Sequence, residues 1–478
     1  MKKGTLLIQN ADYLVTCDDQ DFVYENADIL IDGEKITAVR GRRRWQAVGI
    51  TSKGPDEPVV SDCPADDEVW EANETISGKG MIVYPGLVNT HHHFYQIFTR
   101  NILQVQNMEL FPWLKYLYEI WKNLNEDTVH YSTLTSLGEL LMTGCTTAVD
   151  HHYVFPAGAG MLIDRQFEAA SLIGARMVAT RGSMDLSVKD GGLPPDSVVQ
   201  TIDEIMKDSE RLVRTYHTGK PFAMRQMVLA PCSPFSVSAD LLRESAVLAR
   251  ELGVCLHTHL CETKDEENYM LEKEGIRPLE YMKRLGWTGN DVWYAHGIHF
   301  TDEELDFLAE TGTGVAHCPI SNMKLSSGVA KITEMLNKGV KVGLAVDGSA
   351  SNDGSNLLEE LRVSFLIHRL QKSNEAPTGY DILKVATRGS ASLIGRDELG
   401  AVAEGKASDL FMIDRNQETL ISADRDPAAM LGTVGYKGKT KYTIVNGRIV
   451  VKDGHLVNVD EAELVEKANA EAKRLYAG

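Results

Sequence analysis

The chain has 478 residues, of which 43% are hydrophobic and 24% are charged, as is typical of a soluble globular protein. Its 49 basic and 68 acidic residues give a formal net charge of −19. This charge argues against a surface that binds nucleic acid or an anionic membrane, and it favours a small neutral or cationic partner.

The N-terminal part of the chain has the pattern of short strands joined by turns. Its first apolar run, LLI, is followed by Gln9 and is too short for a signal peptide, and no later run reaches the length of a membrane span. Alternating apolar runs flank Asp32-Gly33, which is a hairpin signal. The basic cluster Arg40 to Arg44 is interpreted as a solvated loop.

The middle of the chain alternates strands with helices, which is the pattern of a parallel sheet. Helices are predicted over 239–252 and 302–310, the second with a capping box of Thr301 and Glu304. Eight apolar runs are predicted to form strands: 81–93, 145–152, 175–182, 226–233, 254–262, 292–297, 314–322 and 342–348. Eight strands with crossover helices favour closure, so we expect an α/β fold with a distorted (β/α)8 TIM barrel over residues 79–399.

The C-terminal part returns to short strands and turns. Residues 409–458 contain the turns Asn446-Gly447 and Asp453-Gly454, and residues 461–476 have the composition of a terminal helix. We expect residues 1–78 and 400–478 to combine into one small β-sandwich domain, with this helix as part of it.

The ends of the predicted barrel strands carry polar side chains. Nearly every run begins apolar and ends in His, Asp, Glu, Cys or Arg. In a (β/α)8 barrel, the C-terminal strand ends form the active-site face. On the first strand, His91 and His93 point to one side and His92 to the other, because side chains alternate along a strand. Two imidazoles in this arrangement can bind one metal ion.

The fifth predicted strand carries His257 and His259 on its inward side. His259 lies nearer the mouth and is interpreted as a third ligand, whereas His257 is interpreted as a deeper, hydrogen-bonded core residue. His296 and Asp347 occupy the ends of the sixth and eighth strands. Three imidazoles and the Asp347 carboxylate suit Zn²⁺ or Fe²⁺ and leave room for a water molecule.

The cysteines point to a reducing environment. The seven cysteines include no C-x-x-C pair, so neither a zinc knuckle nor a disulfide framework is indicated. Reduced thiols in a cytoplasmic protein are the simpler interpretation. The expected location is therefore cytoplasmic, with no membrane partner.

Five motifs carry a resemblance to a known family. PGLVNTHHH, LHTHLCE, YAHG, HCPISN and AVDGSASND resemble, in this order, the signatures of the mononuclear-metal deaminase branch of the amidohydrolase superfamily. GAVAEGKASDLFMID resembles the junction back to the small β-domain of that family, so the resemblance covers nearly the whole chain. It implies an aminohydrolase with one divalent metal ion per chain, Zn²⁺ first and Fe²⁺ as the alternative, and a homo-oligomer.

The resemblance also implies a role for each site residue. The metal ligands would be His91, His93, His259 and Asp347. The metal would lower the pKa of a bound water towards about 7, and Asp347 would take its proton as hydroxide attacks the substrate. Glu262 would protonate the ring nitrogen and then the departing amine. His296 would position the hydroxide or polarise the substrate.

Three stretches indicate the substrate. HHHFYQIFTR, RGSMDLSVKDGGLPPDSVV and LAPCSPFSVS look like the 8-oxoguanine deaminases and the related hydroxytriazine aminohydrolases. We therefore expect deamination of 8-oxoguanine to urate. A guanine or pterin deaminase and a triazine amino- or chlorohydrolase are the alternatives, and a non-catalytic barrel is a remote one. Cys232 stands where S-adenosylhomocysteine deaminases usually carry a histidine, which disfavours adenosine-type substrates.

The candidate substrate contacts are spread more widely along the sequence than the proposed metal ligands. They are Gln96, Trp113, Arg181, Cys232 and His317, with a structural salt bridge as the alternative role of Arg181. Asp150, His151 and His152 end the second strand and either support the site or touch the substrate. The loop over 181–199, with its paired glycines and prolines, is expected to form a lid over the mouth.

Overall fold

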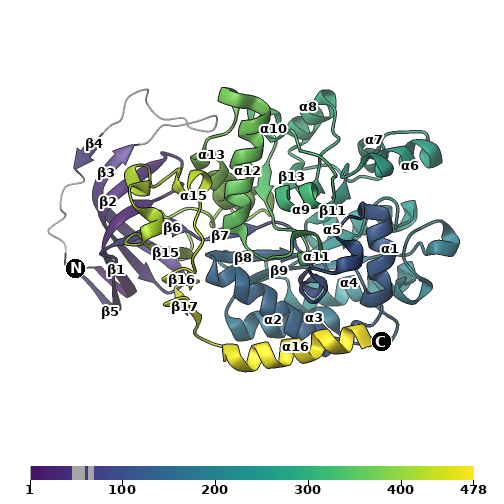
Figure 1. Cartoon of the computed structure of the whole chain (residues 1–478), viewed down its shortest axis with the longest axis horizontal. Helices are drawn as coiled ribbons and strands as arrows, with labels where there is room; N and C mark the ends of the chain where they lie inside the picture. Colours follow the sequence, from purple (N-terminus) through teal and green to yellow (C-terminus); the bar gives the residue numbers. More distant parts are fainter. Residues whose placement is uncertain (1, 46–59, 63–68, 478) are drawn as a thin grey trace.

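The computed structural model describes residues 2–45, 60–62 and 69–477, and these form two sheets with helices around one of them (Figure 1). One sheet has eight parallel strands that follow the chain order from β7 to β14. The strands are β7 (Leu87–Asn89), β8 (Cys145–Asp150), β9 (Arg176–Ser183), β10 (Arg225–Pro231), β11 (Leu256–Leu260), β12 (Val292–His296), β13 (Gly314–His317) and β14 (Val342–Leu344). The predicted barrel is confirmed.

The barrel closes between its first and last strands. The backbone N–H of Thr90 donates to the carbonyl of Leu344 over 3.1 Å, and that of Asp347 donates to the carbonyl of His91 over 3.1 Å. The helices that follow the strands include α2 (Glu126–Met142), α3 (Leu162–Ile173), α4 (Ile202–Tyr216), α5 (Ala239–Leu252), α6 (Lys264–Glu274), α8 (Asp302–Thr311) and α12 (Leu357–Lys372). Closure therefore brings the ends of β7 and β14, with their polar residues, side by side.

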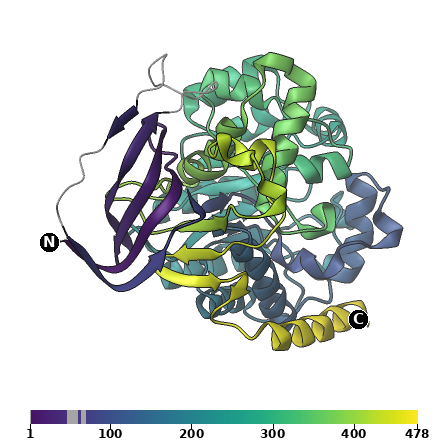
Figure 2. The ribbon, with the colours of Figure 1, turned by 60° about the vertical axis from the view of Figure 1, so that its left-hand side comes forward.

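The second sheet is mixed and combines both ends of the chain, as predicted; Figure 2 shows it beside the barrel. Its order is β18-β17-β16-β15-β6-β1-β2-β3-β4, and β5 pairs with β1. The strands are β1 (Lys2–Val15), β2 (Phe22–Asp32), β3 (Lys35–Trp45), β4 (Val60–Asp62), β5 (Trp70–Ser77), β6 (Met81–Pro85), β15 (Leu410–Asp414), β16 (Tyr442–Val445), β17 (Arg448–Lys452) and β18 (His455–Leu456).

The apolar run over 81–93 is divided between the two sheets. Its first part, β6, pairs with β1 and β15, and only its second part, β7, belongs to the barrel. The break is Gly86, where a Cβ atom would lie 2.2 Å from the Thr146 hydroxyl oxygen. The prediction that the whole run is one barrel strand was wrong, because an apolar run does not tell which sheet it joins.

The basic cluster Arg40 to Arg44 is also corrected. These residues lie within β3 and not in a loop. The Nε of Arg40 donates to Asp28 Oδ2 over 2.8 Å, and its guanidinium lies 4.1 Å from the centre of the Trp70 ring. Arg40 therefore packs against its own sheet.

The terminal helix α16 (Glu461–Ala477) forms as predicted, but it lies along the barrel helix α2 and not on the mixed sheet (Figure 1). Arg474 donates to Asn125 Oδ1 over 2.8 Å, and Asn123 donates to the carbonyl of Leu475 over 3.1 Å. Helix α1 (Leu110–Trp121) ends two residues before Asn123. The end of α16 is thus hydrogen-bonded to the residues that directly follow α1.

Two further expectations concern the environment of the chain. Among the described residues, no helix combines the length and the apolar composition needed to cross a membrane. Six cysteines are free thiols, and the seventh, Cys63, lies outside the described residues.

A candidate metal-dependent active site

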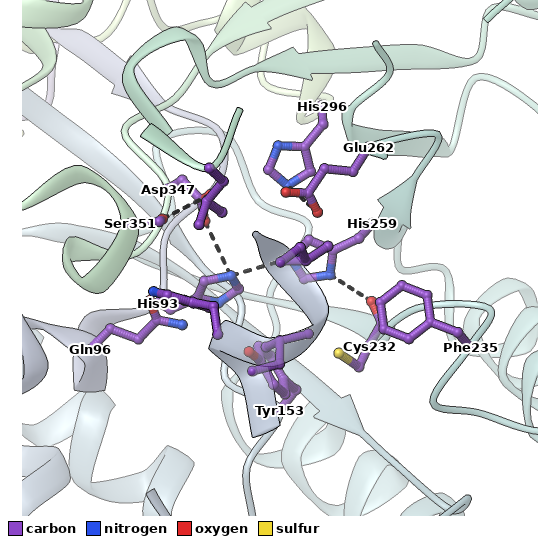
Figure 3. A pocket seen from close by; sticks show the side chains of 14 residues that line it. His93, Gln96, Tyr153, Cys232, Phe235, His259, Glu262, His296, Asp347 and Ser351 are labelled. Carbon is purple, nitrogen blue, oxygen red and sulfur yellow. Dashed lines mark hydrogen bonds and ion pairs between the residues drawn. The ribbon is translucent and has the colours of Figure 1, made fainter. Parts of the chain in front are cut away.

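Four donor atoms converge at the C-terminal mouth of the barrel, and Figure 3 shows three of the residues that carry them, His93, His259 and Asp347. Asp347 Oδ1 lies 3.3 Å from the Nε2 atoms of both His91 and His93. His259 Nε2 lies 3.2 Å from His93 Nε2. Ligand atoms about 2.0–2.1 Å from one ion in a tetrahedral arrangement are roughly 3.3 Å apart. The spacing therefore fits one divalent metal ion.

Hydrogen bonds at the other ring nitrogens fix how these imidazoles are protonated. His93 Nδ1 lies 2.7 Å from the carbonyl of His151, and His259 Nδ1 lies 2.6 Å from the carbonyl of Cys232. A carbonyl only accepts, so each Nδ1 carries the proton and each Nε2 directs a lone pair to the centre.

The protonation of His91 follows in the same way, but its hydrogen-bond partner is His257 and not a backbone carbonyl. His257 Nδ1 lies 2.9 Å from the carbonyl of Trp293, so His257 Nε2 accepts from His91 Nδ1 over 2.7 Å. His91 Nε2 is buried and has no hydrogen-bond partner among the described residues. Lone pairs that face a carboxylate oxygen repel it unless a cation lies between them. The arrangement fits a metal site.

The carboxylate of Asp347 is held on both sides. The backbone N–H of Gly348 donates to Oδ1 over 2.7 Å, and the hydroxyl of Ser321 donates to Oδ2 over 2.6 Å. Ser321 belongs to α9 (Pro319–Lys324), which follows β13. Oriented in this way, the carboxylate presents one oxygen to the metal position.

Glu262 and His296 form the other wall of the site. Glu262 Oε2 lies 3.4 Å from His296 Nε2, and the Ser327 hydroxyl lies 3.5 Å from Oε1. His296 Nδ1 bonds to Asn322 Oδ1 over 2.8 Å, which aims Nε2 at Glu262. Burial, with a smaller effect from the charge of Asp347, raises the pKa of Glu262 to about 8. This raised pKa favours the protonated form of the carboxyl group, which can donate its proton.

Three residues at these strand ends adopt left-handed backbone conformations: Cys261 (φ +54°), His296 (φ +73°) and Asp347 (φ +63°). Such conformations are costly for residues other than glycine and concentrate at functional sites. Here they turn the chain sharply where the side chains of Glu262, His296 and Asp347 meet.

A cavity of about 30 Å³ is lined by three of the four donor residues, His93, His259 and Asp347. Its outer wall is apolar and comes from Leu110, Trp113 and Leu114 on α1, together with Phe235 and Leu325. This volume is on the scale of one or two water molecules. In this structure the cavity is therefore smaller than a heterocycle.

Three of the five predicted substrate contacts line the cavity: Gln96, Trp113 and Cys232. Gln96 Oε1 and Trp113 Nε1 are buried and have no hydrogen-bond partner among the described residues. Burial raises the pKa of the Cys232 thiol to about 12, so it is neutral. Two polar atoms of the wall are thus available to a bound molecule.

Arg181 and His317 lie outside the cavity, contrary to expectation. Arg181 donates to Asp208 over 2.7 Å and to Gln200 over 2.8 Å, on the helix side of β9. This is the structural salt bridge that was its alternative role. His317 Nε2 lies 3.2 Å from Nε2 of His368 in α12, behind the barrel wall.

The residues that end β8 support the site and do not line the cavity. Asp150 accepts from the backbone N–H of Phe94 and from Gln166, both over 2.6 Å. It therefore holds the turn that follows His93. The loop over 181–199 does not line the cavity either, and α1 occupies the place expected for that loop as a cover.

Several site residues were missed from the sequence. Tyr153, Phe235 and Ser351 line the cavity, and Ser321 and Asn322 orient Asp347 and His296. The HCPISN motif contains the last two, although only its histidine was predicted to contact the substrate. Their position just after β13, at the active-site face, was the available signal.

Comparisons with known proteins agree with this geometry. Residues 82–450 match the Amidohydrolase family. The chain is 46% identical over 397 residues to the 8-oxoguanine deaminase of Pseudomonas aeruginosa, covering 83% of this chain and 88% of that protein. It is 39% identical over 481 residues to the hydroxydechloroatrazine ethylaminohydrolase of Pseudomonas sp. strain ADP, covering 99% and 96%.

Solved structures give the same result. An atrazine chlorohydrolase from Arthrobacter aurescens TC1, complexed with zinc, superposes with a TM-score of 0.88 at 32% identity, covering 98% of this chain and 100% of that one. The fold, the converging His and Asp donors and the family match all point the same way. The chain belongs to the amidohydrolase family and is a hydrolase that acts on C–N bonds, as its deaminase and aminohydrolase relatives do.

Proposed function

We propose that the protein hydrolyses 8-oxoguanine to urate and ammonia. One observation carries the choice of substrate, namely the 46% identity to a protein named 8-oxoguanine deaminase over 83% of this chain. The reaction adds one water across the amidine carbon and expels the exocyclic amine as ammonia, so that a keto group replaces it.

The donor set supports a metal-dependent route. One divalent ion would be held by His91, His93, His259 and Asp347. Zinc is the first choice, because three imidazoles and a carboxylate suit it and because a relative was solved with zinc; Fe²⁺ is the alternative. When bound, such an ion would lower the pKa of water at this site to about 7 and would so supply the nucleophile near neutral pH.

The chain itself moves the protons. Asp347 Oδ1 lies 3.3 Å from the Nε2 atoms of both His91 and His93 and accepts the proton that the attacking water gives up. Glu262, whose pKa is raised, donates its proton to the ring nitrogen. It then takes the second proton of the water from the new hydroxyl group and passes it to the departing amine, and the proton held by Asp347 restores Glu262. His296 Nε2, 3.4 Å from Glu262 Oε2, positions the attacking water and orients Glu262. Ammonia leaves readily only after that second protonation.

The cavity is consistent with an uncharged heterocycle. No lysine or arginine lines it among the described residues, and Cys232 is a neutral thiol. Trp113 Nε1 is a free donor and Gln96 Oε1 a free acceptor. A purine with two keto groups offers both partners, a carbonyl oxygen for the indole N–H and a ring N–H for the amide oxygen.

A hydroxytriazine aminohydrolase is the second candidate, because 39% identity to such an enzyme extends over 99% of the chain. A chlorohydrolase would need no protonated Glu262, since chloride leaves without a proton. A non-catalytic barrel would have no need of a complete donor set.

The deciding experiment compares kcat/KM across 8-oxoguanine, guanine, isoxanthopterin, 5′-deoxyadenosine and an N-ethylamino hydroxytriazine, by release of ammonia from the first four and of ethylamine from the triazine. We expect 8-oxoguanine to exceed each of the others by about tenfold or more, since a site that bonds a polar group strongly rejects analogues lacking it. Faster turnover of the triazine would move the assignment to the second candidate.

A further inference from the structure

A second buried glutamate lies directly behind Glu262. Glu266, in the first turn of α6, is 0% exposed. Its Oε1 accepts from the backbone N–H of Cys261 over 2.8 Å, and its Oε2 accepts from the backbone N–H of Glu262 over 3.0 Å. Each oxygen of one carboxylate thus holds one of two consecutive backbone groups.

This contact differs from the other helix starts of the chain. In α4 and α8, a glutamate three residues after the capping threonine accepts from the backbone N–H of that threonine, as with Glu204 and Thr201 over 2.9 Å. Glu266 stands in the same place relative to Thr263, whose hydroxyl accepts from the Glu266 N–H over 3.2 Å. Its side chain nevertheless reaches past Thr263 to the two preceding residues. It therefore holds the end of β11 as well as the start of the helix.

The same piece of backbone is fixed from the opposite side. Cys261 is in a left-handed conformation (φ +54°), and its carbonyl accepts from the N–H groups of Ile298 and His299 over 2.8 and 3.0 Å. These two residues follow His296 almost directly. Hydrogen bonds on both sides of Cys261 thus set the position of Glu262 relative to His296.

We propose that Glu266 is a positioning residue for Glu262, so this inference rests on the proposed function. Glu266 does not line the cavity and touches no substrate. Its two oxygens hold Glu262 where the carboxyl group meets both the cavity and His296. Loss of this acceptor leaves two buried N–H groups unpaired, and small displacements of a reacting group lower turnover strongly.

The first test replaces Glu266 with glutamine, which keeps the volume but presents an NH₂ group to one of the two donors. We expect E266Q to retain metal and KM while kcat falls by about tenfold or more. The matched control is E204Q, an exposed glutamate in an ordinary capping box, which should leave kcat unchanged. If E266Q does not fold, E266D keeps both acceptor oxygens on a shorter side chain and should show the same loss of kcat.

The second test separates positioning from a general structural role. In an E262Q background, the E266Q substitution should cost little further activity, because the residue through which it acts is already disabled. The same fold-loss in both backgrounds, or wild-type kcat in the folded Glu266 variant, would overturn the inference. A wild-type enzyme that releases no ammonia from any heterocycle would instead contradict the proposed function, and this inference with it.

Discussion

His91 Nδ1 lies 2.7 Å from Nε2 of His257, and His257 Nδ1 lies 2.9 Å from the carbonyl of Trp293. The backbone of β12 thereby sets the protonation of a histidine on β11, which sets that of a histidine after β7. Burial lowers the pKa of His257 to about 3, so this relay stays neutral across the physiological range. His257, which was predicted to be a deeper core residue, thus orients the proposed metal ligand His91.

The first prediction concerns this relay. His257→Phe keeps a packed ring but removes the acceptor for His91 Nδ1. Loss of such an outer hydrogen bond typically weakens metal binding by about 10- to 100-fold. Metal content after dialysis against graded chelator concentrations measures it. His368→Phe, which alters the buried pair with His317 outside the cavity, is the control and should leave metal affinity unchanged.

The second prediction is one divalent ion per chain. His93→Ala should lose metal and activity together while the circular dichroism spectrum is retained, because the barrel packs mainly through other residues. Elemental analysis of the purified protein gives the stoichiometry. Two tightly bound ions per wild-type chain would contradict the single-ion site.

The third prediction tests Glu262 as the proton donor. Glu262→Gln keeps size and hydrogen-bonding capacity but cannot release a proton. Turnover should fall by about 10²- to 10⁴-fold with metal retained, the usual contribution of general acid–base catalysis. Near-normal kcat in this variant would remove Glu262 from the mechanism.

The fourth prediction gives the pH dependence of the same step. Burial raises the pKa of Glu262 to about 8, and the protonated form is the donor. Turnover should therefore be high below this pKa and fall as the pH rises through about 8. The Glu262→Gln variant should lack this basic limb. A wild-type profile that rises across the same range would assign the opposite protonation state to the active form.

The sequence predicted the barrel and the residues of the donor set because both depend on alternation along strands and on strand ends. Alternation does not tell how far a long side chain extends. Arg181 and His317 sit at strand ends as expected, yet they bond to Asp208 and His368 on the helices outside. Nor does a local pattern reveal which distant segment covers the mouth. The sequence placed one residue of α1, Trp113, at the site, but it assigned the role of a lid to the loop over 181–199.

The last prediction concerns how the cavity distinguishes substrates, and it rests on the proposed function. Trp113 Nε1 is a buried donor without a partner among the described residues, and Trp113 lines the cavity from α1. A carbonyl of 8-oxoguanine would accept this bond, whereas guanine lacks one of the two keto groups. An uncharged hydrogen bond contributes about 0.5–1.5 kcal/mol, which corresponds to roughly two- to twelvefold in kcat/KM.

Trp113→Phe should therefore reduce the preference for 8-oxoguanine over guanine by about this factor. Trp121→Phe is the matched control on the same helix, because Trp121 Nε1 donates to the Thr99 hydroxyl over 3.1 Å and the residue does not line the cavity. That variant should lose stability but keep the ratio of the two kcat/KM values. An unchanged ratio of the two kcat/KM values in Trp113→Phe would mean that the indole N–H does not donate to the extra carbonyl of 8-oxoguanine. Gln96 would then be the next candidate for the group that distinguishes the two purines.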